Sequence, residues 1–164
     1  MSAGDTIKRF AACTLHEKMI VAMLALAGEP IGKTRLLQHL ATAAILDDRA
    51  TLDAALERLR TRGMIAELPV RGIFAAPELA WPAMRAAIDE NRFGALCGAY
   101  TRITPLRTGW EGALVLRSYR QGVALLRMAL IDGAAPARVA PLLAACMSCH
   151  EAAYLHPLVD IGDP

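Results

Sequence analysis

The sequence predicts a mainly α-helical protein with one β-hairpin, and three observations support this fold class. Hydrophobic residues make up 55% of the 164 positions but aromatic residues only 5%, so alanine, leucine, methionine, isoleucine and valine must build the core. Alanine and leucine at this density favour helix. Apolar residues recur at helical spacing along most of the chain, whereas residues 64–76 contain two short strand-like runs around a tight turn.

The first 14 residues leave two interpretations open. Ile7 and Phe10 have the spacing of a short helix that packs back on the following domain. The polar start of this segment is equally compatible with a disordered leader over residues 1–14.

A strongly apolar helix is expected from Leu15 until Gly28 and Pro30 end it. Thr14 precedes this helix and Glu17 lies in its first turn, which matches a capping box. In a capping box the side chain of each of these two residues accepts a hydrogen bond from the backbone N–H of the other. Because this helix has only a narrow polar side, several neighbours must cover it. The second half of the chain or a partner protein is expected to do so.

Two amphipathic helices and a hairpin follow. The second helix is expected over residues 32–40 and the third over residues 48–62, where Gly63 ends it in a left-handed conformation. Residues 64–68 and 73–76 then form the strands, with residues 69–72 as the turn. The inward-facing side chains are expected to be Leu36, Leu37, Leu40, Leu52, Ala55, Leu56 and Leu59.

The order of three helices and a hairpin resembles a winged-helix domain over about residues 15–92. The resemblance implies DNA binding as the commonest activity of that fold, with protein docking as the other established use. A fourth helix over residues 79–91 carries Trp81, Met84 and Ile88. In winged-helix proteins such a trailing helix often contacts a second subunit or domain.

The remainder of the chain is expected to form a small helical domain. Residues 93–109 read as a short helix and linker, and residues 110–155 as an antiparallel helical pair. The first helix of the pair is expected over residues 110–131, and the second begins at Pro136 or at Pro141. Residues 156–164 form a tail that resembles the start of a connection to a longer protein. The expected core side chains are Leu114, Leu116, Val123, Leu126, Leu130, Leu142, Leu143 and Cys146.

Charge argues against a strong DNA-binding surface. Residues 15–92 hold ten basic and ten acidic side chains, although phosphate contacts usually require a basic excess. The third helix begins with Asp47 and Asp48 and carries Asp53 and Glu57, which phosphates repel. The residues that would contact DNA are Lys33, Arg35, Arg49, Thr51 and Arg71.

Two further sets of arginines have a simple interpretation as solvated helix surface. Arg58, Arg60 and Arg62 complement the dipole at the end of the third helix. Arg117, Arg120 and Arg127 would share one face of the helix over residues 110–131, where they are also candidates for contact with an acidic protein partner or a phosphate backbone.

Three signals look chemical. The run of residues 28–34 resembles a phosphate-binding loop, but it has one residue too few and follows a helix rather than a strand. Cys146, Cys149 and His150 match the haem-attachment string, and with His156 they offer zinc ligands. His16 and His39 have no nucleophile or carboxylate at catalytic spacing. We therefore expect no enzymatic activity, no metal and no cofactor, with the cysteines as small apolar core residues.

Location and partners follow from the same composition. The four cysteines are scattered in a chain that shows no secretory leader, which favours the cytoplasm, and no apolar run is long enough to span a membrane. We expect a non-catalytic adaptor that docks onto a protein partner or a second copy within a nucleic-acid-handling assembly. No small-molecule substrate is evident. The expected docking surfaces are the apolar remainder of the first helix and the fourth helix around Trp81 and Met84; a DNA-binding transcriptional regulator is the alternative.

Overall fold

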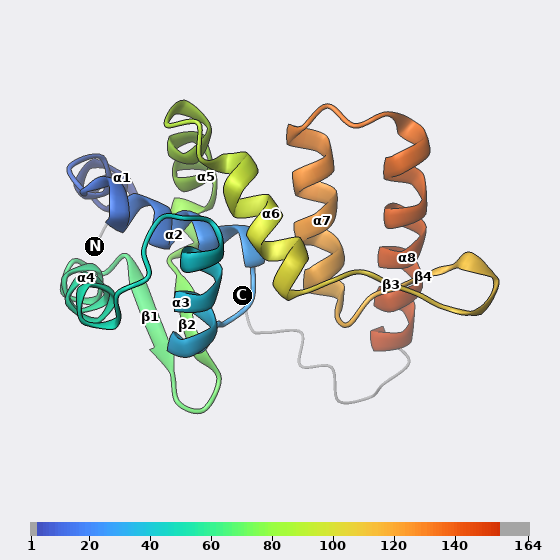
Figure 1. Cartoon of the computed structure of the whole chain (residues 1–164), viewed down its shortest axis with the longest axis horizontal. Coiled ribbons are helices and arrows are strands. Elements are labelled where there is room, and N and C mark those ends of the chain that lie inside the picture. The colour runs from blue at the N-terminus through green and yellow to red at the C-terminus, as the bar shows by residue number, and fades with distance from the viewer. Residues whose placement is uncertain (1–2, 155–164) are drawn as a thin grey trace. The chain divides into compact units, whose positions relative to one another are not determined.

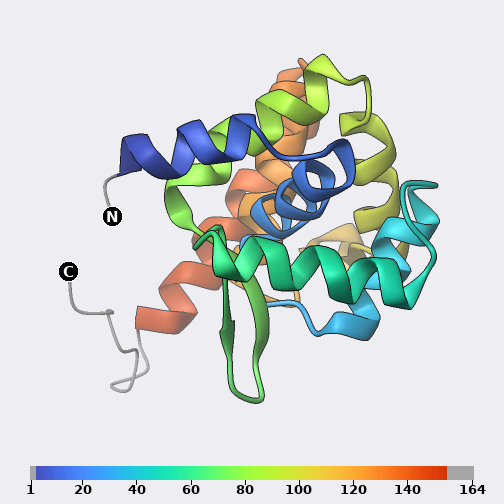
Figure 2. The same ribbon diagram turned by 90° about the vertical axis from the view of Figure 1, so that its left-hand side faces the viewer.

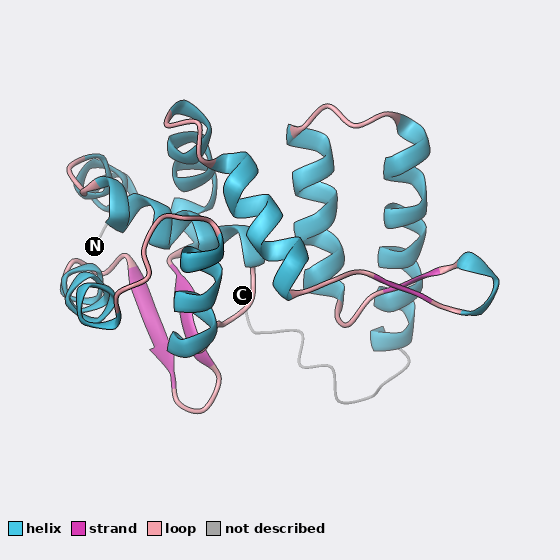
Figure 3. Ribbon diagram, viewed as in Figure 1, coloured by secondary structure: helices cyan, strands magenta, loops and turns pink. Residues whose placement is uncertain are grey.

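The structure, a computed structural model, describes residues 3–154 of the chain (Figure 1). It divides into an N-terminal unit, Met1–Pro105, and a C-terminal unit, Leu106–Pro164. Helices dominate the described residues, and the strands form two small antiparallel sheets of two strands each (Figure 3). The prediction of a mainly α-helical protein is therefore confirmed.

The N-terminal unit contains six helices and one hairpin within the described residues. Its helices are α1 (Ala3–Ala11), α2 (Leu15–Ala27), α3 (Lys33–Thr42), α4 (Arg49–Thr61), α5 (Ala80–Asp89) and α6 (Phe93–Ile103). The strands β1 (Ile65–Leu68) and β2 (Gly72–Ala75) follow α4, and the short 3-10 turn η1 (Pro77–Leu79) precedes α5. The first residues were expected to form either a short helix or a disordered leader; the structure has the helix, α1, and Phe10 is buried.

Helix α2 forms the centre of the N-terminal unit. Every side chain from Met19 to Ala27 is buried. Helices α5, α3 and α4 and strand β2 contact it, so elements of the same unit surround it. The expectation that the second half of the chain or a partner covers this helix is therefore wrong. The predicted capping box is present, because the Glu17 carboxylate accepts the Thr14 N–H at 2.9 Å and the Thr14 hydroxyl accepts the Glu17 N–H at 3.3 Å.

The end of α4 leads directly into the hairpin. Gly63 has φ 71°, and its N–H donates to the Arg60 carbonyl while the Met64 N–H donates to the Leu59 carbonyl. These two bonds form a Schellman motif, which ends a helix with glycine in the left-handed region. The chain then enters β1, which pairs antiparallel with β2 and projects beyond the helices of this unit (Figure 2).

A third backbone segment joins the hairpin, which the sequence did not predict. Ile31 and Ile73 exchange backbone hydrogen bonds of 2.8 and 2.9 Å. At Gly72 a Cβ atom would lie 2.6 Å from the Ile31 carbonyl carbon, and φ is 113°. Glycine is required there because the two backbones approach too closely for a side chain.

The helical stripe of α4 faces the core as predicted. Leu52, Ala55, Leu56 and Leu59 are buried, as are Leu36 and Leu40 of α3, whereas Leu37 is only half-buried. Residues 93–109, expected as a short helix and linker, contain the whole of α6, which packs on α3.

The C-terminal unit consists of a second hairpin and two helices within its described residues. Its elements are β3 (Arg107–Thr108), the 3-10 turn η2 (Trp110–Gly112), β4 (Leu114–Val115), α7 (Tyr119–Ile131) and α8 (Pro136–Tyr154). Helices α7 and α8 run antiparallel and pack against each other (Figure 1). The tail over residues 156–164 lies outside the described residues.

The single helix predicted over residues 110–131 is wrong over residues 110–118. Gly112 has φ 79°, which a helix does not accommodate, and the chain forms the β3–β4 hairpin instead. Helix α7 begins only after Ser118, whose hydroxyl accepts the Gln121 N–H at 3.1 Å. Serine at the residue before a helix is a strong start signal, which the sequence interpretation overlooked.

The predicted core of the C-terminal unit is also partly wrong. Leu130 and Leu143 are 65% and 49% exposed, and the other expected leucines and Val123 are half-buried. The buried side chains of α7 include Ala124, Leu125 and Met128 instead, and Cys146 of α8 is buried as expected. Of the two starts considered for the second helix, α8 has the earlier one, and Pro141 lies inside it.

Candidate interaction surfaces

The start of α4 carries a group of charged residues that bind one another. The Asp53 carboxylate lies 3.1 Å from the Lys33 Nζ and 3.2 Å from the Arg49 Nε. The hydrogen bond from Lys33, followed by that from Arg49, holds the pKa of Asp53 below its usual value against the effect of burial. Thr51 is engaged as well, because its backbone N–H donates to the Asp48 carboxylate at 2.7 Å. The positive charges of Lys33 and Arg49 are thus balanced by Asp53 at the start of α4, the part of the helix that would contact bases in a DNA-binding helix-turn-helix.

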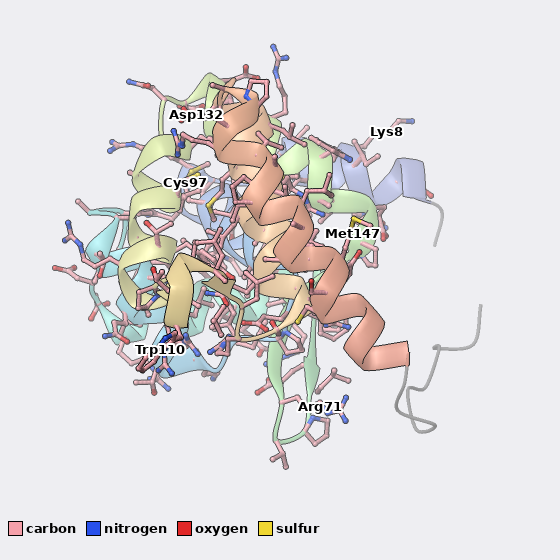
Figure 4. All side chains as sticks on the ribbon, turned by 90° about the vertical axis from the view of Figure 1, so that its right-hand side faces the viewer. Lys8, Arg71, Cys97, Trp110, Asp132 and Met147 are labelled. Carbon is pink, nitrogen blue, oxygen red and sulfur yellow. The ribbon has the colours of Figure 1, made fainter. Side chains whose placement is uncertain are left out.

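The two remaining DNA-contact candidates lie elsewhere. Arg35 points to α6 and donates to the Thr104 hydroxyl at 2.8 Å. Arg71 lies exposed in the turn of the β1–β2 hairpin (Figure 4). The structure therefore brings Lys33 and Arg49 together at Asp53, whereas Thr51 binds Asp48 and neither Arg35 nor Arg71 joins this group.

A buried histidine joins α3 to α6. His39 is 1% exposed and stacks on Tyr100, with ring centroids 5.9 Å apart and an angle of 14° between the rings. Burial lowers the pKa of His39 to about 4, and the positive charge of Arg35 adds to this effect. Its Nδ1 has no hydrogen-bond partner among the described residues. His39 is thus neutral at physiological pH and serves packing, as the sequence interpretation allowed, while His16 is exposed.

Glu17 is a buried carboxylate that the sequence interpretation treated only as a cap. The Arg58 Nε donates to it at 2.7 Å, and the Arg62 guanidinium lies 3.5 Å away. Burial raises the pKa of Glu17, but the hydrogen bonds from Arg58 and the Thr14 N–H outweigh burial and lower the pKa overall.

The three arginines at the end of α4 are partly solvated, as expected, but they also form ion pairs that the sequence interpretation did not predict. Arg58 and Arg62 balance the Glu17 carboxylate, and Arg60 forms ion pairs with Glu57 and Glu67. The sequence could not indicate the pairing of Glu17 with Arg58, because 41 positions separate the two residues.

The predicted docking surfaces are reduced to the outer face of α5. Helix α2 leaves no apolar remainder beyond Leu15, and Met84 is 1% exposed in the core, so neither offers the expected surface. Trp81 and Ile88, seven residues apart on α5, are 66% and 43% exposed. Arg85 lies between them and donates to Asp89 at 2.9 Å. We call Trp81, Arg85 and Ile88 the α5 face; their spacing places them on one side of the helix.

The three arginines expected on one helix face do not share a helix. Arg117 precedes α7, whereas Arg120 and Arg127 lie two turns apart on it, and Arg127 is half-buried. Sequence reasoning missed the neighbouring exposed Trp110, 95% exposed in the turn of the β3–β4 hairpin, because it placed this residue inside a helix.

The cysteine–histidine string lies on α8. Cys146 is buried against α7, and burial followed by the neighbouring Cys149 raises the pKa of its thiol. His156, the fourth candidate ligand, lies outside the described residues. Within residues 3–149, whose side chains the structure largely describes, no three His, Cys, Asp or Glu side chains gather as metal ligands would.

The segment that resembles a phosphate-binding loop connects α2 to α3. Gly28 ends α2 with φ 63°, Ile31 pairs with β2, and Lys33 begins α3. The Lys33 amine binds Asp53 rather than facing the backbone amides of a loop. The segment is a helix stop followed by a helix start.

No family model, curated protein or solved structure matches this chain. None of the helices in the described part of the chain combines the length and the apolar character that a membrane span requires.

Proposed function

We propose that the N-terminal unit is a winged-helix module that acts as a non-catalytic adaptor and docks onto a protein through the α5 face. Three helices, α2 to α4, followed by the β1–β2 hairpin, support the assignment of this module. The adaptor works within a nucleic-acid-handling assembly, and its partner is another protein or a second copy of the chain.

The observation that carries the proposal is the contrast between two helix surfaces. On α5, Trp81 and Ile88 expose a large aromatic and a large aliphatic side chain beside an arginine. Tryptophan and arginine are the residues that most often dominate binding energy at protein interfaces. On α4, by contrast, Asp53 already binds Lys33 and Arg49, so phosphate contacts would have to break these ion pairs first.

Crosslinking separates the adaptor from the alternative, a DNA-binding regulator. A photoreactive benzoylphenylalanine replaces Trp81 in one variant and Ala50, exposed on α4, in the other. The adaptor predicts protease-sensitive adducts at position 81 in living cells and few adducts at position 50. Nuclease-sensitive adducts at position 50 would instead support the DNA regulator.

Duplex binding provides the second measurement. We expect fluorescence anisotropy to show no sub-micromolar binding of a short duplex at about 150 mM salt, a condition at which non-specific contacts are weak. Binding that is lost when Lys33→Glu and Arg71→Glu are combined would contradict the adaptor proposal. Arg85→Glu, a single charge reversal on α5, is the control for the effect of reversing a positive charge away from α3 and the hairpin.

A further inference from the structure

The β3–β4 hairpin presents two different faces. In its antiparallel register Arg107 lies opposite Val115 and Thr108 opposite Leu114. Alternate residues of a strand point to opposite faces, so Arg107 and Val115 share one face and Leu114 lies on the other. Leu114 is half-buried and β4 contacts α8, whereas Arg107 is exposed and Val115 is 47% exposed. The face with Arg107 and Val115 is therefore the outer one.

The outer face carries Val115 beside Gly109, and the turn next to it carries an exposed indole. A Cβ atom at Gly109 would lie 2.9 Å from the Val115 Cγ2, so the valine occupies the space that a side chain there would need. The Gly109 N–H donates to the Ala113 carbonyl at 2.8 Å and closes the turn. Trp110 projects from this turn and is 95% exposed (Figure 4). The core of the C-terminal unit gains almost nothing from this large side chain.

The same region carries an excess of positive charge. Residues 106–131 contain four arginines and one acidic residue, Glu111. Arg107, Arg117 and Arg120 are exposed, and they lie around the base of the hairpin and the start of α7. The N-terminus of α7 adds partial positive charge to this end of the unit.

We propose that the outer face of the β3–β4 hairpin and the start of α7 bind single-stranded nucleic acid. Trp110 stacks on an unpaired base, and Arg107, Arg117 and Arg120 contact phosphates. Exposed aromatic rings beside arginines are the features that bind single strands without sequence preference. An acidic peptide would satisfy the arginines but offers no flat face to the indole, and a duplex keeps its bases paired and unavailable for stacking. The site adds a nucleic-acid contact to the C-terminal unit and does not depend on docking through α5.

The test uses the full chain with Trp81→Phe, which leaves Trp110 as the only tryptophan. Oligo(dT) and oligo(U) of about 15 nucleotides, a length that covers several stacking sites, are added at low salt. We expect both to quench the fluorescence of Trp110, with an affinity that falls steeply as salt rises.

Variants locate the contacts. Trp110→Ala should weaken binding of a labelled oligonucleotide roughly tenfold, the loss expected for one stacked base. Combining Arg107→Ala and Arg117→Ala should weaken binding at least as much and reduce the salt dependence. Arg138→Ala is the control for loss of one arginine, since it removes a single positive charge from an exposed site at the start of α8 and should change affinity less than about twofold.

Three outcomes would overturn the proposal. One is an absence of binding to either oligonucleotide at low salt, and another is an equal loss with Arg138→Ala. The third is quenching of Trp110 by poly-glutamate or by duplex DNA as strong as that by the single strands. Since Trp110 is almost fully exposed, its replacement leaves the fold intact, and this variant decides the question even if the double arginine variant unfolds.

Discussion

Helices α2 and α8 both carry few charged residues but differ in burial. The charged residues of α2 are Glu17 and Lys18, and those of the longer α8 are Arg138 and Glu151. Yet α2 is buried from Met19 to Ala27, whereas Leu143 of α8 is 49% exposed. Met147 of the same helix is 57% exposed (Figure 4).

The difference teaches that the number of neighbours, and not only the apolar character of its residues, decides whether a helix is covered. Four helices and strands pack around α2, whereas within the C-terminal unit α8 packs on α7 and touches β4. A small unit with two helices has too little volume to enclose either of them. Substitutions in the two units should therefore differ in cost.

The largest effect is expected where α2 is enclosed most completely. Leu24→Ala should lower the free energy of unfolding by roughly 2–5 kcal/mol, because Leu24 is 1% exposed and the neighbours cannot collapse into the cavity. Leu143→Ala, the same change on α8, should cost less than about 1 kcal/mol. Urea denaturation followed by circular dichroism measures both. Equal losses would show that α8 is covered in solution and would remove the basis of the comparison.

The closed packing of the N-terminal unit should also appear in its pH dependence. His39 has a pKa of about 4 when folded, below its ordinary value of 6.5, so the folded state binds fewer protons than the unfolded state. Its contribution to stability is complete above pH 6.5 and is lost progressively as pH falls toward 4. The difference between these values corresponds to roughly 3 kcal/mol.

His39→Leu isolates this contribution. The variant keeps an apolar side chain between α3 and Tyr100 but cannot take up a proton, so its stability should decline less than that of the parent between pH 6.5 and 4. Carboxylates such as Glu17 titrate in both proteins and cancel in the difference. Parallel stability curves for the two proteins would show that His39 is protonated as easily in the folded chain as in the unfolded one.

One glycine in each unit shows how closely its helix is packed against its neighbours. At Gly122 of α7 a Cβ atom would lie 2.3 Å from the Cys146 Sγ and 2.6 Å from the Leu116 Cδ1, whereas nothing lies within 4 Å at Gly98 of α6. Gly122→Ala should therefore destabilise by about 1–3 kcal/mol. Gly98→Ala should stabilise by up to about 1 kcal/mol, since alanine favours helix more than glycine does. Thermal unfolding distinguishes the opposite signs, and a stabilising Gly122→Ala would mean that α7 and α8 lie farther apart.

The smallest effect concerns the charge that α2 buries. Arg58→Ala removes the main partner of the buried Glu17 and should cost about 1 kcal/mol, a value reduced by the half-exposed guanidinium. Arg60→Ala breaks only ion pairs between exposed side chains and should cost below about 0.5 kcal/mol. Denaturation at neutral pH and at pH 3 measures both, and the cost of Arg58→Ala should shrink in acid as Glu17 is protonated. A cost that is independent of pH would indicate lost alkyl packing instead.

The candidate site could be predicted from the sequence only in part. The sequence predicted a docking surface around Trp81 and Met84, and Trp81 is exposed, but Met84 is buried because α5 packs on α2. Lys33, Arg49 and Asp53 were each recognised as charged surface residues, yet their mutual pairing depends on how α3 meets α4. Trp110 was misplaced because a helical periodicity was extended across Gly112.

Local signals in the sequence determined the ends of elements. Thr14 and Glu17 started α2, Gly63 ended α4, and the turn after Leu68 set the β1–β2 pairing, because capping and turn formation involve residues a few positions apart. Tertiary structure decided which apolar side chains are covered and which charges pair. Burial of α2 and exposure of Leu143 depend on neighbours distant in sequence, and so does the ion pair of Glu17 with Arg58. The sequence of one helix does not determine the free energy of burial or of ion pairing, because both depend on the neighbouring elements that remove water from the side chains.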